Sequence, residues 1–174
     1  EDYNLGASQF SFLLGPVTVA FAVPLYKQLD VLKKNFAVIM TGIVSGCLAS
    51  VASVFACCKL LGLSPVIYYS LIPKSITSSI AVSVSEEIGG ISALTVALVV
   101  LTGLLGAAIA SGMVKLLHLK NKVAIGLAIG TCSHAIGTSR AMQMGEVEGA
   151  MSSLAIVVAG VVTVFLAPVA AMLL

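Results

Sequence analysis

The stretch Gly130–Ala141, G-T-C-S-H-A-I-G-T-S-R-A, decides how the rest of this sequence is interpreted. It contains two glycines, several hydroxyl groups, a histidine and the only arginine of the chain, and it lies between the apolar runs Val123–Ile129 and Met151–Leu174. Irregular backbone at membrane depth is tolerated only where protein buries it or water solvates it. An ionisable residue there indicates a functional site, unless the stretch is a polar loop outside the bilayer.

The composition is that of an integral membrane protein. Hydrophobic residues make up 59% of the chain and charged residues only 9%, whereas soluble domains carry about 25% charged residues. One membrane crossing needs about 20 apolar residues, so 174 residues allow roughly six crossing or half-crossing segments. We therefore predict an all-α polytopic fold in a single membrane domain, residues 1–174. A net charge of +2 argues against a nucleic-acid partner. The partner expected from the composition is the lipid bilayer.

The hydrophobic runs are of two kinds. Continuous runs predict membrane-spanning helices at Asn35–Cys58, Gly90–Val114 and Met151–Leu174. Interrupted runs predict broken or re-entrant helices at Gly6–Tyr26 (break at Gly15 and Pro16), Ser64–Ile88 (break at Pro73) and Val123–Met144 (break at Gly130). Proline lacks the backbone N–H and disfavours helix at the residue before it, and glycine weakens a helix.

A shift of 60 residues aligns the second interrupted run with the third. Ser79 then matches Ser139, and the shift places Lys74 opposite His134. Weak internal similarity of this kind is typical of transporters built from structural repeats. Two runs rich in small residues also align partly by chance.

The lysines constrain the topology. The most basic loops, Lys27–Lys34 and Lys115–Lys122, are expected on the cytoplasmic side. They share a side only if Ser64–Ile88 enters the membrane and returns without crossing. Pro73 and Lys74 then lie near the tip of that segment.

Neither a metal site nor an enzyme is expected. The four cysteines fall in apolar segments without a C-x-x-C pair, so no metal, cofactor or disulfide framework is predicted. Ser133 and His134 are adjacent, but no G-x-S-x-G turn and no Gly-rich phosphate loop accompanies them.

Several separated motifs resemble the LrgB/CidB family. They are L-G-P-V-T-V-A-F-A-V-P-L-Y-K-Q (Leu14–Gln28), P-K-S-I-T (Pro73–Thr77), S-E-E-I-G-G-I-S-A-L-T (Ser85–Thr95), the opening stretch (Gly130–Ala141) and E-G-A-M-S-S-L-A (Glu148–Ala155). Where many members have T-T-P, this chain has T-S-S at residues 77–79, so one proline-made break is absent. Members usually carry further hydrophobic sequence before the position of Glu1, so we expect an N-terminal portion to be missing.

The resemblance implies one of two functions. Bacterial inner-membrane members are described as antiholin-like modulators of murein hydrolases and autolysis. They work with a small LrgA/CidA-type membrane protein. A plant relative in the plastid inner envelope moves glycolate and glycerate, and some bacterial pairs are linked to pyruvate uptake. A homo-oligomer is also compatible with the sequence.

The transport members suggest a small carboxylate substrate, and the polar residues fit that ligand. In this hypothesis Lys74 and Arg140 supply positive charge, and the N-termini of the half-helices supply unpaired N–H groups. His134 couples transport to protons, because the ordinary pKa of histidine, about 6.5, is close to physiological pH. The remaining site residues are Ser75, Thr77, Ser133 and Thr138 as hydrogen-bond partners and Gly137 for close backbone approach. The alternatives are that Lys74 is a snorkelling lysine of a surface loop, that Arg140 pairs with Glu146 or Glu148, and that His134 hydrogen-bonds a carbonyl in a helix contact.

Overall fold

The computed structural model describes residues 26–27 and 29–173, and helices are the regular structure of that part of the chain. The helices are α3 (Leu29–Lys34), α4 (Phe36–Leu61), α5 (Pro65–Leu71), α6 (Ser78–Glu87), α7 (Ser92–Leu116), α8 (Lys122–Met144) and α9 (Glu146–Ala171). The all-α polytopic fold class is therefore confirmed. The break expected at Gly15 and Pro16 lies outside the described residues.

Three helices, α4, α7 and α9, are long and apolar enough to span a membrane. Each has 25 or 26 residues, a length of roughly 38 Å at 1.5 Å per residue, which exceeds the bilayer core. They correspond to the three continuous runs. The last begins at Glu146 and not at Met151, because acidic residues in a first turn are favoured by the partial positive charge of a helix N-terminus.

The interrupted run Ser64–Ile88 forms two short helices, α5 and α6, joined by turns at residues 72–77, the first break that the structure describes. Pro73 lies in this first break. Both short helices contact the start of α7, because the Thr95 hydroxyl donates to the Ser70 carbonyl at 3.1 Å and to Ser85 Oγ at 2.7 Å. One residue of α7 thus touches both arms, and the run folds back on itself.

The second break lies at His134, whose φ of 41° and ψ of −139° interrupt α8. The prediction of a break at Gly130 is corrected, since Gly130 is helical. A Cβ at Gly130 would lie 2.8 Å from the Cβ of Ala155. This glycine therefore serves close packing between α8 and α9.

The two arms of α8 run in opposite directions along α9. Residues 122–133, the first arm, run parallel to it, and residues 135–144, the second arm, run antiparallel. The contacts that establish this are Gly126 with Met151 and Gly130 with Ala155 for the first arm, and Thr138 with Ser152 and Met142 with Gly149 for the second. Helix α8 is therefore a re-entrant hairpin with His134 at its tip.

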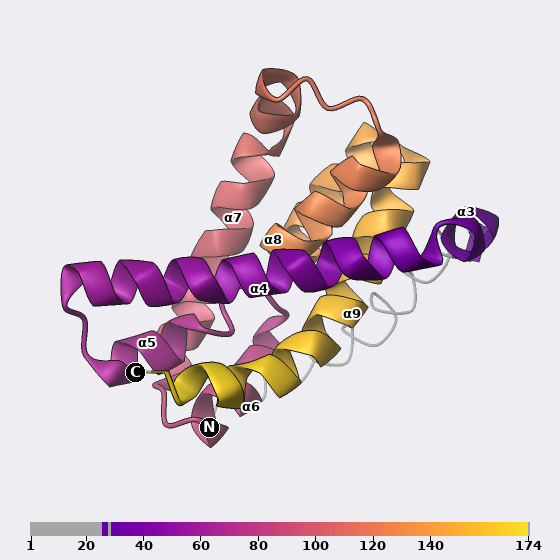
Figure 1. The fold of residues 1–174 in the computed structure, drawn as a ribbon. Coiled ribbons are helices and arrows are strands. Elements are labelled where there is room, and N and C mark those ends of the chain that lie inside the picture. Colours follow the sequence, from indigo (N-terminus) through magenta and orange to yellow (C-terminus); the bar gives the residue numbers. More distant parts are fainter. Residues whose placement is uncertain (1–25, 28, 174) are drawn as a thin grey trace, which may run out of the picture.

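The chain contains the same unit twice, a re-entrant hairpin followed by a spanning helix. The first unit is α5, α6 and α7, and the second is α8 and α9. The predicted shift of 60 residues relates them: Ser70 with Thr95 in one unit corresponds to Gly130 with Ala155 in the other. Helices α7 and α9 run in opposite directions (Figure 1), so the two units form an inverted repeat of the kind found in transporters.

Helix α4 packs across the second unit, as Figure 1 shows. Its first half contacts α8 and α9 through Ile39 and Ile43. Its second half packs with Tyr68 of α5, whose hydroxyl donates to the Ala170 carbonyl at 2.8 Å. The starts of α4 and α8 lie at one end of the bundle, since Val123 packs against the cluster that contains Ile39. The two basic segments, residues 27–34 (largely helix α3) and 115–122, therefore lie at that end, and α6 ends at the opposite end.

Candidate functional site

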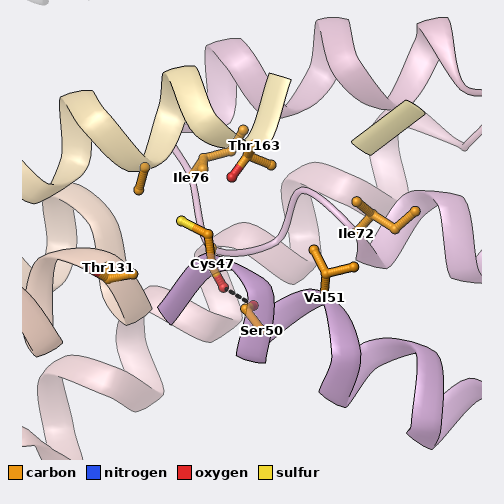
Figure 2. A pocket seen from close by; sticks show the side chains of 9 residues that line it. Cys47, Ser50, Val51, Ile72, Ile76, Thr131 and Thr163 are labelled. Atoms are coloured by element: carbon orange, nitrogen blue, oxygen red, sulfur yellow. Dashed lines mark hydrogen bonds between the residues drawn. The ribbon is translucent and has the colours of Figure 1, made fainter. Parts of the chain in front are cut away.

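A small cavity lies where the first break meets α4, α8 and α9. Figure 2 shows side chains from these segments converging on it. Its lining is Cys47, Ser50, Val51, Ile72, Ser75, Ile76, Thr131, Ala159 and Thr163. The cavity volume of about 10 Å³ is that of roughly one water molecule, so the site is closed to a larger ligand in this conformation.

Lys74 lies at the edge of this cavity with its charge held by hydroxyl groups. Its Nζ donates to Ser50 Oγ at 3.3 Å and to Ser75 Oγ at 3.2 Å, and the two hydroxyls are 3.1 Å apart. Lys74 is half-buried, and no carboxylate among the described residues lies within ion-pair distance of it. A half-buried cation with neutral partners is suited to an anionic ligand.

Helix α6 begins directly after the cavity-lining residues of the first break. Thr77 is its N-cap, with extended backbone at φ −64° and ψ 145°, and the Thr77 side chain makes no capping hydrogen bond. The first N–H groups of a helix lack intrahelical partners and carry partial positive charge. Thr77 thus lies at a helix start beside Ser75 and Lys74.

His134 is buried, and its Nε2 lies 2.9 Å from the carbonyl oxygen of Val99 on α7. This is the alternative raised for it above, a histidine bonded to a carbonyl in a helix contact. Two glycines of α7 accommodate the break: a Cβ at Gly103 would lie 2.6 Å from His134 Cε1, and a Cβ at Gly106 would clash with Ser133. Gly103 and Gly106 therefore leave a notch in the surface of α7, the glycine notch, into which the tip of α8 packs.

The other predicted residues of the second break are committed to internal contacts. Thr138 Oγ1 donates to the His134 carbonyl at 2.9 Å and shares a 2.7 Å hydrogen bond with Ser152. Gly137 allows the two arms of α8 to touch, since its Cβ would lie 3.1 Å from Ile129 Cγ2. The second break is thus closed, whereas the first break lines a cavity.

The two breaks meet at α7. The Val99 carbonyl oxygen is the hydrogen-bond partner of His134 Nε2. The Val99 side chain packs with Ile76 of the first break and Ala81 of α6 in one buried cluster. The structure therefore brings Lys74, Ser75, Thr77 and His134 to the same region of the bundle.

Arg140 lies elsewhere. Its guanidinium donates to Ser111 Oγ at 2.8 and 3.1 Å and to Gln143 Oε1 at 2.8 Å. Ser111 is twelve residues beyond Val99 on α7, which is roughly 18 Å along a helix. The alternative pairing with Glu146 or Glu148 is also not made: Glu146 bonds Lys27 at 3.1 Å, and no partner among the described residues satisfies the buried Glu148 Oε2.

Sequence reasoning missed the cavity residues that come from the continuous helices. Ser50 on α4 and Thr163 on α9 are isolated hydroxyls in apolar runs, and such residues usually bond their own helix backbone. The available signal was the G-x-x-x-G at Gly42 and Gly46. A Cβ at Gly46 would lie 2.9 Å from Thr131 Cγ2, so that motif brings the Ser50 face of α4 against α8.

Comparison with known proteins places the chain in a family. The model of the LrgB-like family matches residues 1–173. The chain belongs to the LrgB-like family. Proteins named antiholin-like protein LrgB from Bacillus cereus (strain B4264) and Bacillus anthracis (strain A0248) are each 44% identical to it over 168 residues, which cover 97% of this chain and 73% of theirs. No solved structure matches the chain.

Two of the LrgB-like motifs coincide with the breaks of the fold. P-K-S-I-T at Pro73–Thr77 is the first break, and the stretch Gly130–Ala141 contains the second. The His134 imidazole points to Val99 and not to the neighbouring Ser133. Within the described part of the chain, His, Cys, Asp and Glu side chains do not gather into a group of three that could hold a metal.

Proposed function

We propose that this LrgB-like membrane protein is a carrier of small monocarboxylates of the glycolate, glycerate or pyruvate type in a bacterial inner membrane. The observation that carries the proposal is Lys74, half-buried at a helix break beside a cavity and held only by hydroxyl groups. A carboxylate entering the site would replace Ser50 and Ser75 as the partner of Nζ. It would thereby exchange neutral acceptors of the ammonium for a charged one, and the N⁺–H···O⁻ bonds of such a pair are short and strong.

The inverted repeat supports alternating access to such a site. Transporters with inverted repeats bind substrate at broken helices near the midplane and expose it by rocking one repeat against the other. The closed cavity fits an occluded state, and the symmetry-related break at His134 is packed shut against α7. In this proposal the opening of the first break admits the carboxylate.

His134 is the proposed proton-coupling residue. An Nε2–H donor to the Val99 carbonyl leaves Nδ1 as the acceptor of a second proton. Protonation at Nδ1 would place a second cation close to Ile76 and the first break, which favours an anion there. The proposal does not include Arg140.

The test is uptake of radiolabelled pyruvate, glycolate and lactate into proteoliposomes holding the full-length protein, with and without an LrgA-type partner. We expect saturable uptake of one of them and a loss of apparent affinity of about ten- to a hundredfold in Lys74→Gln, the value of one charge-assisted hydrogen bond. Lys59→Gln is the matched control, because Lys59 lies over the Phe55 ring at 5.4 Å and does not line the cavity. Wild-type uptake by a folded Lys74→Gln protein would overturn the proposal.

A second candidate is regulation of murein hydrolases together with an LrgA-type partner. The names of the Bacillus relatives, antiholin-like protein LrgB, favour it, and the comparisons support it more directly than they support transport. Zymography of cells expressing the chain with its partner would measure this activity. If Lys74→Gln leaves the hydrolase pattern unchanged while the proteoliposomes take up no carboxylate, regulation replaces transport as the function.

A further inference from the structure

The Arg140 guanidinium lies between α7 and the second arm of α8. It is half-buried, and its hydrogen-bond acceptors are the neutral groups of Ser111 and Gln143. No described carboxylate accepts a hydrogen bond from it. Ser111 Oγ accepts two N–H groups from the arginine, so its own O–H proton is directed away and is free to donate to a ligand.

The surface of α7 changes from apolar to basic along the side of the helix that carries Ser111. Leu104, Ala108, Ser111 and Lys115 follow one another at spacings of four, three and four residues, which places them on one strip of the helix. Leu104 is 55% exposed, and Ala108 and Lys115 are also exposed. Lys115 is one turn beyond Ser111, in the last turn of α7, so the strip runs along the outside of α7 from the middle of the helix to its end.

This end of the bundle is rich in positive charge. The described basic residues there are Lys27, Lys33, Lys34, Lys115, Lys120, Lys122 and Arg140, against the acidic residues Asp30, Glu146 and Glu148. Lys27 and Glu146 neutralise one another at 3.1 Å. The ends of spanning helices lie at the level of lipid headgroups, where basic pockets between helices bind anionic lipids.

We propose that the surface around Arg140, between α7 and the second arm of α8, binds the headgroup of an anionic phospholipid. Arg140 binds the phosphate with its planar guanidinium, Ser111 donates its hydroxyl proton, and Lys115 supplies the second charge. The acyl chain lies along Leu104 and Ala108. A free anion would make no use of that apolar strip, and the occupant is therefore a lipid.

The test compares full-length protein in nanodiscs of phosphatidylcholine with and without phosphatidylglycerol. Native mass spectrometry measures phosphatidylglycerol retained per protein, and thermal unfolding measures the midpoint shift that it causes. We expect Arg140→Gln to retain roughly fivefold less phosphatidylglycerol, because one basic residue near the membrane surface contributes about 1 kcal/mol to the binding free energy. We also expect this variant to lose the midpoint shift. Lys115→Gln, an exposed position that does not bear on folding, should reduce retention as well.

Three results would overturn the proposal. The first is wild-type retention by both variants, or by Lys115→Gln alone if Arg140→Gln does not fold. The second is equal loss in Lys59→Gln, at the opposite end of the bundle, which would make the effect one of total charge. The third is an equal midpoint shift from inorganic phosphate in phosphatidylcholine discs, which would identify a free-anion site.

Discussion

His134 adopts a backbone conformation that L-residues avoid, and this has a measurable consequence. A non-glycine residue held at such a φ costs about 1–3 kcal/mol, and the observed φ is 41°. Glycine removes that cost, whereas alanine keeps it, and both lose the bond to the Val99 carbonyl. We therefore expect His134→Gly to be more stable than His134→Ala by about 1 kcal/mol, seen as a higher midpoint of thermal unfolding in one detergent.

The next residue is the control for that comparison. Ala135 is half-buried in the regular part of the second arm, where glycine costs about 1 kcal/mol relative to alanine. Ala135→Gly should lower the midpoint, so glycine helps only at 134. Equal midpoints for His134→Gly and His134→Ala would show that His134 bears no strain.

Single residues also decide how far the sequence predicts the site. Pro73 marks the first break because the missing N–H is visible in the sequence, and Lys74 beside it was predicted as the charge. His134 carries no such mark, and the glycines on either side of it, Gly130 and Gly137, are both helical. That break is set by contacts with Val99 and Gly103, which lie about thirty residues earlier in the chain.

At the scale of elements, the glycine notch of α7 fixes the tip of α8. A Cβ at Gly103 would lie 2.6 Å from His134 Cε1 and 2.9 Å from Ile136 Cδ1, so both side chains must shift. We expect Gly103→Ala to destabilise the protein by about 1–3 kcal/mol, the usual cost of overpacking. Gly112→Ala, on the same helix with nothing within 4 Å, should be neutral or stabilising because alanine is the better helix former.

Thermal unfolding of the two purified variants in one detergent measures this difference. A Gly103→Ala midpoint equal to that of Gly112→Ala would mean that the α8 tip does not dock on α7.

The continuous helices α4, α7 and α9 were predictable, because an apolar run long enough to span a bilayer is a local property. The docking was not, since small residues at positions 103 and 106 look the same in a sequence whether they face lipid or another helix.

At the scale of the whole molecule, the inverted repeat explains why the two breaks differ. The first break faces Ala159 and Thr163 of α9 across the cavity, and the second faces Val99 and Gly103 of α7. The shift of 60 residues relates these pairs: Val99 corresponds to Ala159 and Gly103 to Thr163. Each hairpin therefore docks on the spanning helix of the other unit, and one dock is closed while the other retains a cavity.

The re-entrant course of α8 makes a prediction about sidedness. A straight helix of 23 residues would extend roughly 35 Å and carry Gln143 across the membrane from Lys120. The hairpin instead returns Gln143 to the end at which Lys120 lies, and Glu87 lies at the other end. With the native cysteines replaced by alanine, we expect single cysteines at positions 120 and 143 to react with a membrane-impermeant maleimide from the same side of oriented vesicles, and a cysteine at 87 to react from the opposite side.

Labelling of position 143 together with position 87 would mean that α8 crosses the bilayer. The inverted repeat would then be lost, because α9 would run in the same direction as α7. The contacts of α9 argue against that outcome. A straight α8 would separate Gly126 and Met142 by sixteen residues, roughly 24 Å, yet Gly126 packs on Met151 and Met142 packs on Gly149, within one turn of α9. Only a helix that turns back at His134 brings both ends of α8 to that one turn.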